Sequence, residues 1–264
     1  MRKLFVCLII AFLSFVCFLA KASALEIDQQ KVEITASDVY ASRYIWRGQD
    51  LYGNNDGAHQ PSLDIAFPKV LGATDVSFNI WGSFPLVDGH EDAEELDYTL
   101  TFSRNCFEEA LSIAAGFTYF DFPNTSSTAD VSEPWAGITL NSIPGLPIDV
   151  ALDLFAGYDF KAKSGGPDEG WYYSWGLSTE FPLPESLIFQ DGQTLSLGVT
   201  NWGNDGVANL EPSFLYATDI SLSTSYELAS FSVSPSLNYT INHEDSINSG
   251  DEELWGSIEV SYAF

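Results

Sequence analysis

Residues 147–160 read PIDVALDLFAGYDF, and apolar side chains alternate there with polar or small ones. The even positions from Ile148 to Phe160 are all apolar, whereas the odd positions include three aspartates. A period of two places these sets on opposite faces of an extended strand. The alternation continues for thirteen residues, about twice the usual length of ~5–6 residues for a strand. The stretch therefore predicts a long strand with one apolar and one polar face.

The same pattern recurs along the chain. It predicts twelve strands, at residues 31–47, 59–68, 75–84, 94–104, 110–122, 132–142, 147–160, 170–181, 193–202, 213–227, 231–241 and 253–264. Connections after odd-numbered strands are long and acidic, whereas most of those after even-numbered strands are tight. An even number of ~10-residue alternating strands, with loops at one end and turns at the other, is the plan of outer-membrane barrels. We therefore predict an all-β, transmembrane, antiparallel up-and-down β-barrel of about 12 strands.

The composition distinguishes this barrel from other classes of protein. Of 264 residues, 45% are hydrophobic and 18% charged, which is not typical of a disordered chain. A soluble two-sheet sandwich would also alternate, but its outer face would carry fewer large aromatic side chains. Aromatic residues near strand ends are typical of the girdles of a membrane barrel; they are Tyr40, Tyr44, Trp46, Trp135, Trp171, Tyr173 and Trp175.

The first residues predict export from the cytoplasm. Arg2 and Lys3 precede an apolar run over residues 4–20, and Ala22-Ser23-Ala24 follows it. This order is typical of a cleaved signal peptide, and an uncleaved membrane anchor is the alternative. We therefore assign residues 1–24 to a signal peptide and residues 25–264 to one barrel domain.

The last strand carries a second targeting feature. Ile258, Val260, Tyr262 and Phe264 share one face, and the sequence ends in an aromatic residue. Such a strand resembles the signal by which the outer-membrane assembly machinery accepts barrel proteins. We therefore expect these four residues to act as a membrane-insertion signal and the protein to lie in the outer membrane of a Gram-negative bacterium.

The charge balance excludes some partners. The chain has 10 Lys and Arg against 37 Asp and Glu, and without residues 1–24 it keeps 7 basic and 37 acidic residues, a net charge of −30. Nucleic acid is excluded, because its phosphates need a basic surface. Cys106 is the single cysteine after residue 24, so neither an intramolecular disulfide nor a cysteine-rich zinc site is expected. Acidic loops offer oxygen ligands for Ca²⁺ or Mg²⁺ but no spaced ligand pattern, and we expect no metal site and no cofactor.

The lumen would hold the remaining charged side chains, because Arg or Lys facing lipid costs about 2–4 kcal/mol at the midplane. Arg43 and Arg47 are four residues apart on the first predicted strand, so we expect them to share its inner face. Predicted pore-lining carboxylates are Asp64, Asp97, Asp149, Asp153, Asp159 and Glu180. Together they form either a structural ladder or a cation-favouring constriction. The same parity places Asp38 on the lipid side, which predicts a bulge or a later strand start.

Catalysis is the less favoured interpretation. Barrel hydrolases use a His-x-Ser pair on one strand face, whereas His59 and Ser62 are three residues apart, on opposite faces. Asp88-Gly89-His90 offers one Asp-x-His pair of the kind found in omptin-like proteases, but its companion Asp-x-Asp is missing. We therefore expect no enzymatic activity.

Four motifs suggest a family. Ser42–Gly48 (SRYIWRG), Gln60–Asp64 (QPSLD), Asn79–Ser83 (NIWGS) and Glu95–Tyr98 (ELDY) resemble the TorF-type porin family, most strongly over residues 35–105. The resemblance implies an outer-membrane channel-like barrel and names no solute.

These observations lead to two functional hypotheses. The first is a porin that lets small hydrophilic solutes diffuse passively and favours cations, since a net charge of −30 surrounds the pore mouth with negative potential. The alternative is a structural or adhesive barrel with a plugged lumen that conducts nothing. In either case the expected partners are outer-membrane lipids, lipopolysaccharide and the outer-membrane assembly machinery. The porin hypothesis adds small solutes.

Overall fold

The computed structural model describes residues 26–27, 30–53, 56–125, 129–146, 148–162, 164–185, 190, 192–245 and 247–264. The predicted signal peptide, residues 1–24, lies outside these ranges and stays a prediction.

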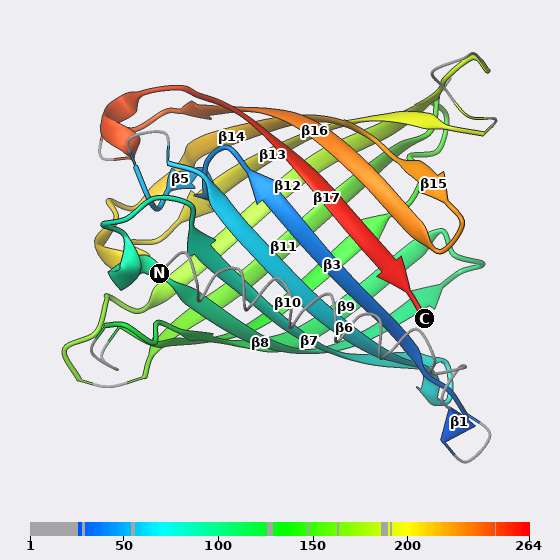
Figure 1. Ribbon diagram of the computed structural model, residues 1–264, viewed down its shortest axis with the longest axis horizontal. Helices are drawn as coiled ribbons and strands as arrows, with labels where there is room; N and C mark the ends of the chain where they lie inside the picture. Colours follow the sequence, from blue (N-terminus) through cyan, green and yellow to red (C-terminus); the bar gives the residue numbers. More distant parts are fainter. Residues whose placement is uncertain are drawn as a thin grey trace.

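Twelve long strands form one closed antiparallel up-and-down barrel, as the alternation predicted (Figure 1). They are β3 (Glu33–Ala41), β6 (Ala58–Leu71), β7 (Thr74–Pro85), β8 (Glu95–Cys106), β9 (Leu111–Asp121), β10 (Val131–Leu140), β11 (Val150–Lys161), β12 (Gly170–Pro182), β13 (Thr194–Asn204), β14 (Ser213–Thr224), β16 (Phe231–Asn242) and β17 (Glu253–Ala263). Each pairs with its neighbours in the chain, and β17 closes the barrel on β3.

Short elements complete the architecture. Strand β15 (Tyr226–Leu228) pairs with β16, β1 (Glu26–Ile27) pairs with β2 (Gln30–Lys31), and β4 (Ile45–Trp46) pairs with β5 (Gln49–Asp50). Three single 3-10 turns are η1 (Glu91–Ala93), η2 (Val207–Asn209) and η3 (Asn248–Gly250).

The two ends of the barrel differ in kind. At one end, residues 72–73 and 107–110 form tight turns between neighbouring strands; we call this the turn end. At the other, the long-loop end, six longer connections join the strands and carry β4, β5 and the three 3-10 turns (Figure 1). This asymmetry was predicted from the sequence, and the long-loop end is where the candidate site forms.

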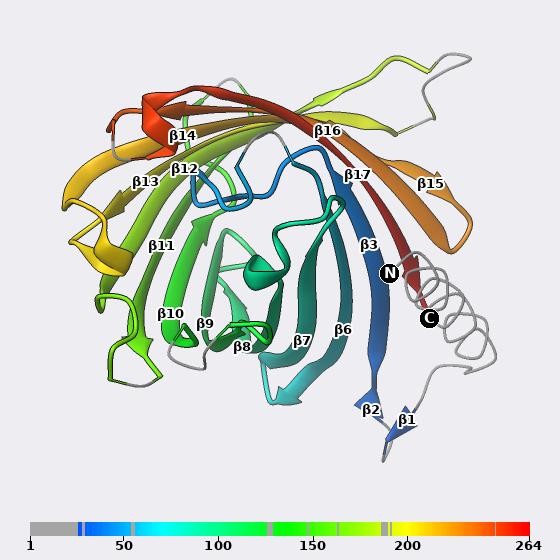
Figure 2. The same ribbon diagram turned by 60° about the vertical axis from the view of Figure 1, so that its left-hand side comes forward.

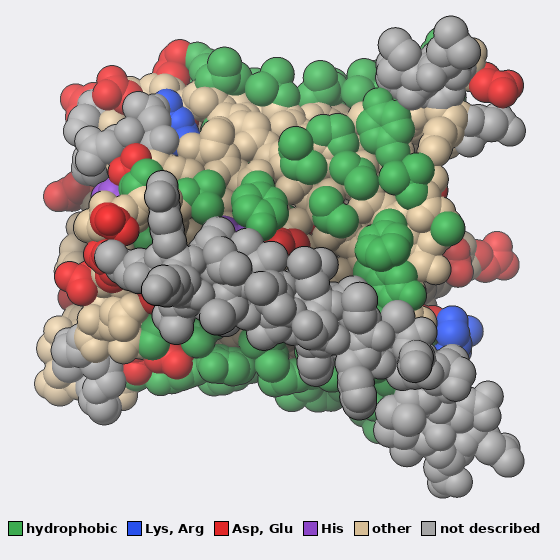
Figure 3. All heavy atoms as spheres, in the orientation of Figure 1, with side chains coloured by type: hydrophobic (Ala, Val, Ile, Leu, Met, Phe, Trp, Pro, Cys, Tyr) green, Lys and Arg blue, Asp and Glu red, His purple; other side chains and the backbone are tan. Residues whose placement is uncertain are grey.

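The outer wall is apolar between two acidic ends. Hydrophobic side chains cover it, and Asp and Glu gather toward both ends (Figure 3). Leu177 and Ile258 keep 49% and 52% of their surface exposed, although they lie within strands. Among the described residues, no helix is long and apolar enough to cross a membrane.

The predicted aromatic girdle is partly wrong. Trp135 faces inward, since it lies two residues from the buried Glu133 on β10 and its indole N–H donates to Thr118 of β9. Tyr44 and Trp46 leave the wall altogether, as described below. The register gives Trp171 of β12 the opposite parity to the buried Tyr172, so Trp171 lies on the outer wall.

An aspartate and a histidine lie together on the outer wall. Asp38 of β3 is three residues before the end of its strand, and its Oδ1 lies 2.7 Å from Nε2 of His59 on β6. The ring of Tyr40 stacks on His59 with centroids 4.9 Å apart. The predicted parity of Asp38 is confirmed, but the expected bulge is wrong, because the β3 ladders with β6 and β17 run without a register shift. A neighbouring histidine, rather than an irregular strand, accommodates this carboxylate.

Polar ladders line the inner wall. Asp64, Asn79, Thr99, Thr118 and Glu133 are successive cross-strand partners on β6 to β10. Directly opposed residues share a face and interact, so this row faces the lumen together. Hydrogen bonds from Asn79 to Asp64, at 3.3 Å, and between Thr99 and Thr118, at 3.0 Å, link its members.

Candidate functional site: a hairpin inserted into the lumen

The chain turns into the barrel after β3. Strand β3 ends at Ala41, opposite Ala58 at the start of β6, and the connection between them carries the small β4–β5 hairpin. We call residues 42–53 the inserted hairpin. Figure 2 shows it lying across the opening at the long-loop end. The prediction of a first strand as far as residue 47 is therefore wrong, and so is the shared strand face of Arg43 and Arg47.

A two-residue turn reverses the chain at the tip of the hairpin. Arg47 and Gly48 connect β4 to β5 with φ of 48° and 80°. Positive φ at both central residues is typical of a type I′ turn, which matches the twist of a hairpin. A Cβ at position 48 would collide with Cβ of Ala217 on β14. Glycine is therefore required both by the turn and by its close approach to the opposite wall.

The side chain of Arg47 is fixed on the far wall. Its two terminal nitrogens lie 2.8 and 2.6 Å from the two carboxylate oxygens of Glu133 on β10. Four rings surround the guanidinium at 4.3–5.8 Å from their centroids; they belong to Trp46, Tyr172, Phe155 and Trp202. Bidentate pairing and cation–π contacts are the two strong interactions that arginine makes.

A glycine makes room for this pair. Glu133 is 2% exposed, and a Cβ at Gly157 of β11 would collide with its carboxylate. Residue 157 lies opposite Tyr172 of β12, whose ring also contacts Arg47. The missing side chain at Gly157 thus leaves the space in the wall that the ion pair occupies.

The hairpin backbone is held as well. Tyr216 of β14 donates to the carbonyl oxygen of Arg47 at 2.8 Å. Asn248 of η3 donates to the carbonyl of Gly48 at 3.0 Å and accepts from the amide of Asp50 at 2.8 Å. The tip is therefore fixed by side-chain and main-chain contacts from three different parts of the barrel.

The flanks of the hairpin bind the near wall. Tyr44 donates to Glu95 of β8 at 2.6 Å, and the hydroxyl of Tyr52 lies 2.9 Å from that of Ser83 on β7. Burial raises the pKa of Tyr52 to about 12 and the pKa of Tyr44 well above its ordinary value. Both phenols therefore stay neutral and keep their protons for hydrogen bonding.

Arg43 takes a separate place from Arg47. It pairs with Glu253 of β17 and lies 3.7 Å from Asp50 in its own hairpin. The two arginines thus bind β17 and β10 respectively instead of forming one ring of charge. Each has its own carboxylate partner, and Arg47 also acts electrostatically on Glu95, Asp97 and Asp159.

Five of the six carboxylates expected in the lumen lie at inward positions of the wall, and the sixth does not. Asp64, Asp97, Asp153 and Glu180 lie on inward positions of the wall. Asp159 of β11 also points inward and is 6% exposed. Asp149 does not line the lumen, because β11 begins at Val150 and Asp149 accepts from Ser142 in the exposed connection before it.

Sequence reasoning missed four acidic anchors. Glu95, Glu133, Asp219 and Glu253 all face inward; Asp219 accepts from Trp202 at 2.8 Å and Thr240 at 2.6 Å. Parity could have found Glu133, since it alternates with outward Pro134 and Ile138 in a predicted strand. No local sequence pattern predicts that Glu133 binds Arg47, which lies 86 residues earlier.

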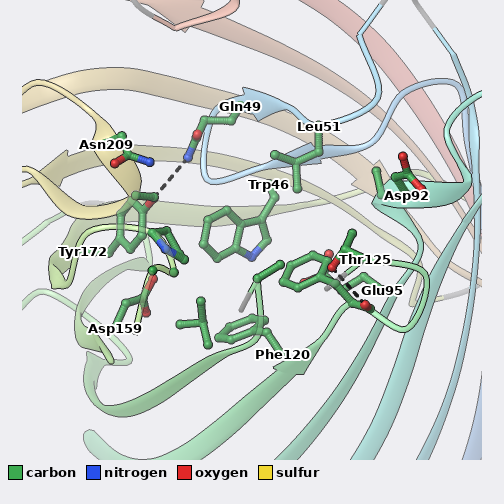
Figure 4. Close-up of a pocket in the computed structure, with 18 residues that line it drawn as sticks. Trp46, Gln49, Leu51, Asp92, Glu95, Phe120, Thr125, Asp159, Tyr172 and Asn209 are labelled. Carbon is green, nitrogen blue, oxygen red and sulfur yellow. Dashed lines mark hydrogen bonds between the residues drawn. The ribbon is translucent and has the colours of Figure 1, made fainter. Parts of the chain in front are cut away.

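A cavity of about 690 Å³ lies beside the hairpin at the long-loop end (Figure 4). Its walls come from the hairpin, from η1 and η2, and from the inner faces of β8 to β12. Trp46 lies between the rings of Phe120 and Tyr172, at centroid distances of 5.9 and 5.3 Å. Gln49 donates to the hydroxyl of Tyr172 at 3.4 Å.

Small side chains line the lumen toward the turn end. The inward residues of β12 to β16 there include Gly176, Ser178, Ser196, Gly198, Ser221, Ser223 and Ser236. The long-loop half holds the inserted hairpin in addition to its own larger side chains. We infer that the narrowest part of the lumen is at the hairpin.

His59 and Ser62 lie on opposite faces of the wall. His59 faces outward while Ser62 bonds to Ser37 in the lumen, as their spacing predicted. His90 pairs with Asp56 at 2.7 Å. Within the described part of the chain, no three His, Cys, Asp or Glu side chains are grouped so that they could hold a metal ion.

Comparisons with known proteins agree with the barrel. No protein-family model matches the chain, and no curated protein matches it in sequence. An outer-membrane channel from Pseudomonas putida F1 is similar in structure, with a TM-score of 0.54 and 10% identity over 88% of this chain and 95% of that one. The KdgM porin has a TM-score of 0.49 and 11% identity over 87% and 99%. The first match shows the fold: the chain is a closed antiparallel barrel of the kind that outer-membrane channels adopt.

Proposed function

We propose that the protein is an outer-membrane channel of the porin type, through which small hydrophilic solutes diffuse passively and cations pass more readily than anions. It needs no cofactor and performs no covalent chemistry. The observation that carries the proposal is the inserted hairpin, which narrows a polar lumen without making the wall irregular. The resemblance of residues 35–105 to the TorF-type porins supports the same class.

The excess of inward carboxylates supports the cation preference. Arg43 and Arg47 are each paired with an acid, whereas Asp64, Asp153 and Glu180 add negative charge to the wall. Fixed charges of one sign concentrate counter-ions within about a Debye length, ~8 Å at physiological salt. A narrow lumen keeps a permeating ion within that distance of the wall.

Reversal potentials in a potassium chloride gradient test this preference. We expect the wild type to favour potassium, and Arg43→Ser with Arg47→Ser to change conductance and to strengthen that preference. Arg104→Ser is the control, since it removes the same kind of charge near the turn end of β8. It should change neither the conductance nor the preference for potassium. A wild type that favours chloride would refute the acidic-lumen interpretation.

A second prediction tests the location. The protein should fractionate with outer membranes, accept lipid and lipopolysaccharide around its apolar wall, and migrate faster on a detergent gel before heating than after it. Barrels behave this way because their closed hydrogen-bond network has no free strand edge. Recovery of folded protein in the periplasmic fraction would contradict it.

One observation favours a second function, a non-conducting structural or adhesive barrel. The hairpin binds both the near wall, through Tyr44, and the far wall, through Arg47, so it could close the lumen entirely. Single-channel recording from folded protein in planar bilayers separates the two functions. The complete absence of conductance steps would favour the plugged barrel.

A further inference from the structure

The cavity beside the inserted hairpin has the size of a small-molecule site. Its volume of about 690 Å³ falls within the range of ~300–1,000 Å³ in which such ligands bind. The hairpin supplies Trp46, Gln49 and Leu51, and η1, η2 and strands β8 to β12 with their loops supply the rest. A solute entering from the long-loop end would meet this cavity next to the hairpin.

The carboxylic acids that line the cavity have no basic residue beside them in its lining. Asp92, Glu95 and Asp159 line it, and its eighteen lining residues, all of them described, include no Lys, Arg or His. Glu95 already accepts a hydrogen bond from Tyr44. Arg47 acts electrostatically on Asp159 but gives both terminal nitrogens to Glu133.

Asp159 is the feature that points to a ligand. The residue is 6% exposed and its carboxyl group lies against that of Glu133, and no donor among the described residues hydrogen-bonds to its Oδ1. A buried carboxylate oxygen without a donor is costly, and native proteins rarely leave one. The side chain lines the cavity below Tyr172 (Figure 4), where a bound donor would satisfy it.

The aromatic walls indicate what kind of donor this is. Rings of Trp46, Phe120, Phe122 and Tyr172 line the same cavity. A metal ion would need several oxygen ligands in one group, and the described residues form none. Organic ammonium ions instead commonly bind in sites that combine aromatic rings with one carboxylate.

We propose that this cavity binds an organic ammonium ion, with Asp159 as its counter-ion and hydrogen-bond acceptor and the rings of Trp46, Phe120 and Tyr172 around its apolar part. The proposal names the class of solute for the proposed function, and its transport part rests on that function. Binding itself requires only the folded barrel.

Binding to the refolded, detergent-solubilised protein tests the proposal, measured by calorimetry and by tryptophan fluorescence. The probes are 2-phenylethylammonium, the anion 3-phenylpropionate and the neutral 2-phenylethanol, which share one ring and a similar length. We expect the cation to bind at least about tenfold more tightly than the anion, because one charge-assisted hydrogen bond accounts for such a ratio. Equal binding of the three probes, or none, would overturn the proposal.

Matched variants locate the site. Asp159→Asn should weaken binding of 2-phenylethylammonium about tenfold and leave binding of 2-phenylethanol unchanged. Asp153→Asn is the control, since Asp153 lies on the same face of β11 but accepts from Thr139 away from the cavity. Asp92→Asn changes the exposed η1 and leaves the wall as it is, and it should weaken binding of the cation by a smaller factor. If Asp159→Asn and Asp153→Asn behave alike, Asp159 is not the counter-ion.

The same samples in planar bilayers keep the two proposals apart. Binding without conductance would refute the channel while the site stands, and conductance without binding would refute the site alone. Block of the potassium current by 2-phenylethylammonium, relieved in Asp159→Asn, would support both.

Discussion

Arg47→Met should lower the free energy of unfolding by about 3–5 kcal/mol, because it leaves Glu133 charged, buried and unpaired. Unfolding in urea, followed by tryptophan fluorescence, measures this loss. The double variant Arg47→Met with Glu133→Met should recover most of it, since two apolar side chains can replace a buried ion pair at little cost.

An exposed ion pair in the same chain provides the control. Lys31 and Glu33 form a pair whose side chains keep 70% and 48% of their surface in solvent, and such pairs contribute about 0–1 kcal/mol. Lys31→Met should therefore change stability little. If Arg47→Met costs no more than Lys31→Met, the Arg47–Glu133 pair does not hold the hairpin.

Removing the inserted hairpin should raise single-channel conductance several-fold. Ala41 and Ala58 are cross-strand partners, so Asn-Gly in place of residues 43–56 can join β3 to β6 directly as a tight turn. The wall then stays intact while the long-loop half of the lumen loses its contents. Planar bilayer recordings on the refolded variant give the measurement.

Shortening the connection over residues 183–193, at the turn end, is the matched control and should leave conductance unchanged. Conductance that is the same with and without the hairpin would show that the constriction lies elsewhere. Conductance that appears only after the deletion would identify the wild type as the plugged barrel.

The strands were predictable because alternation is a local signal. Each strand of the barrel separates an apolar outside from a polar inside, so its pattern needs no knowledge of its neighbours. Strand β7 was predicted as 75–84 and found as Thr74–Pro85, and β11 as 147–160 and found as Val150–Lys161.

The candidate site was predictable only in part. Residues 42–47 continue the alternation of the first strand, because Tyr44 and Trp46 are buried against the inside of the barrel as they would be against lipid. The pattern therefore could not distinguish a hairpin in the lumen from a strand in the wall. The one local clue was the Arg47-Gly48 turn, and the partners Glu133 and Tyr216 lie 86 and 169 residues later.

These long separations bear on how the barrel assembles. The hairpin follows the first wall strand, yet its anchors belong to β10, β14 and η3, which come much later in the chain. Contacts between distant parts of a chain form late, because the entropy of closing the intervening loop has to be overcome first. The wall closes where β3 meets β17, over a sequence separation that is longer still. We therefore expect the hairpin to be fixed only when β10, β14 and η3 are in place, so that the lumen fills at the same late stage of maturation in which the wall closes.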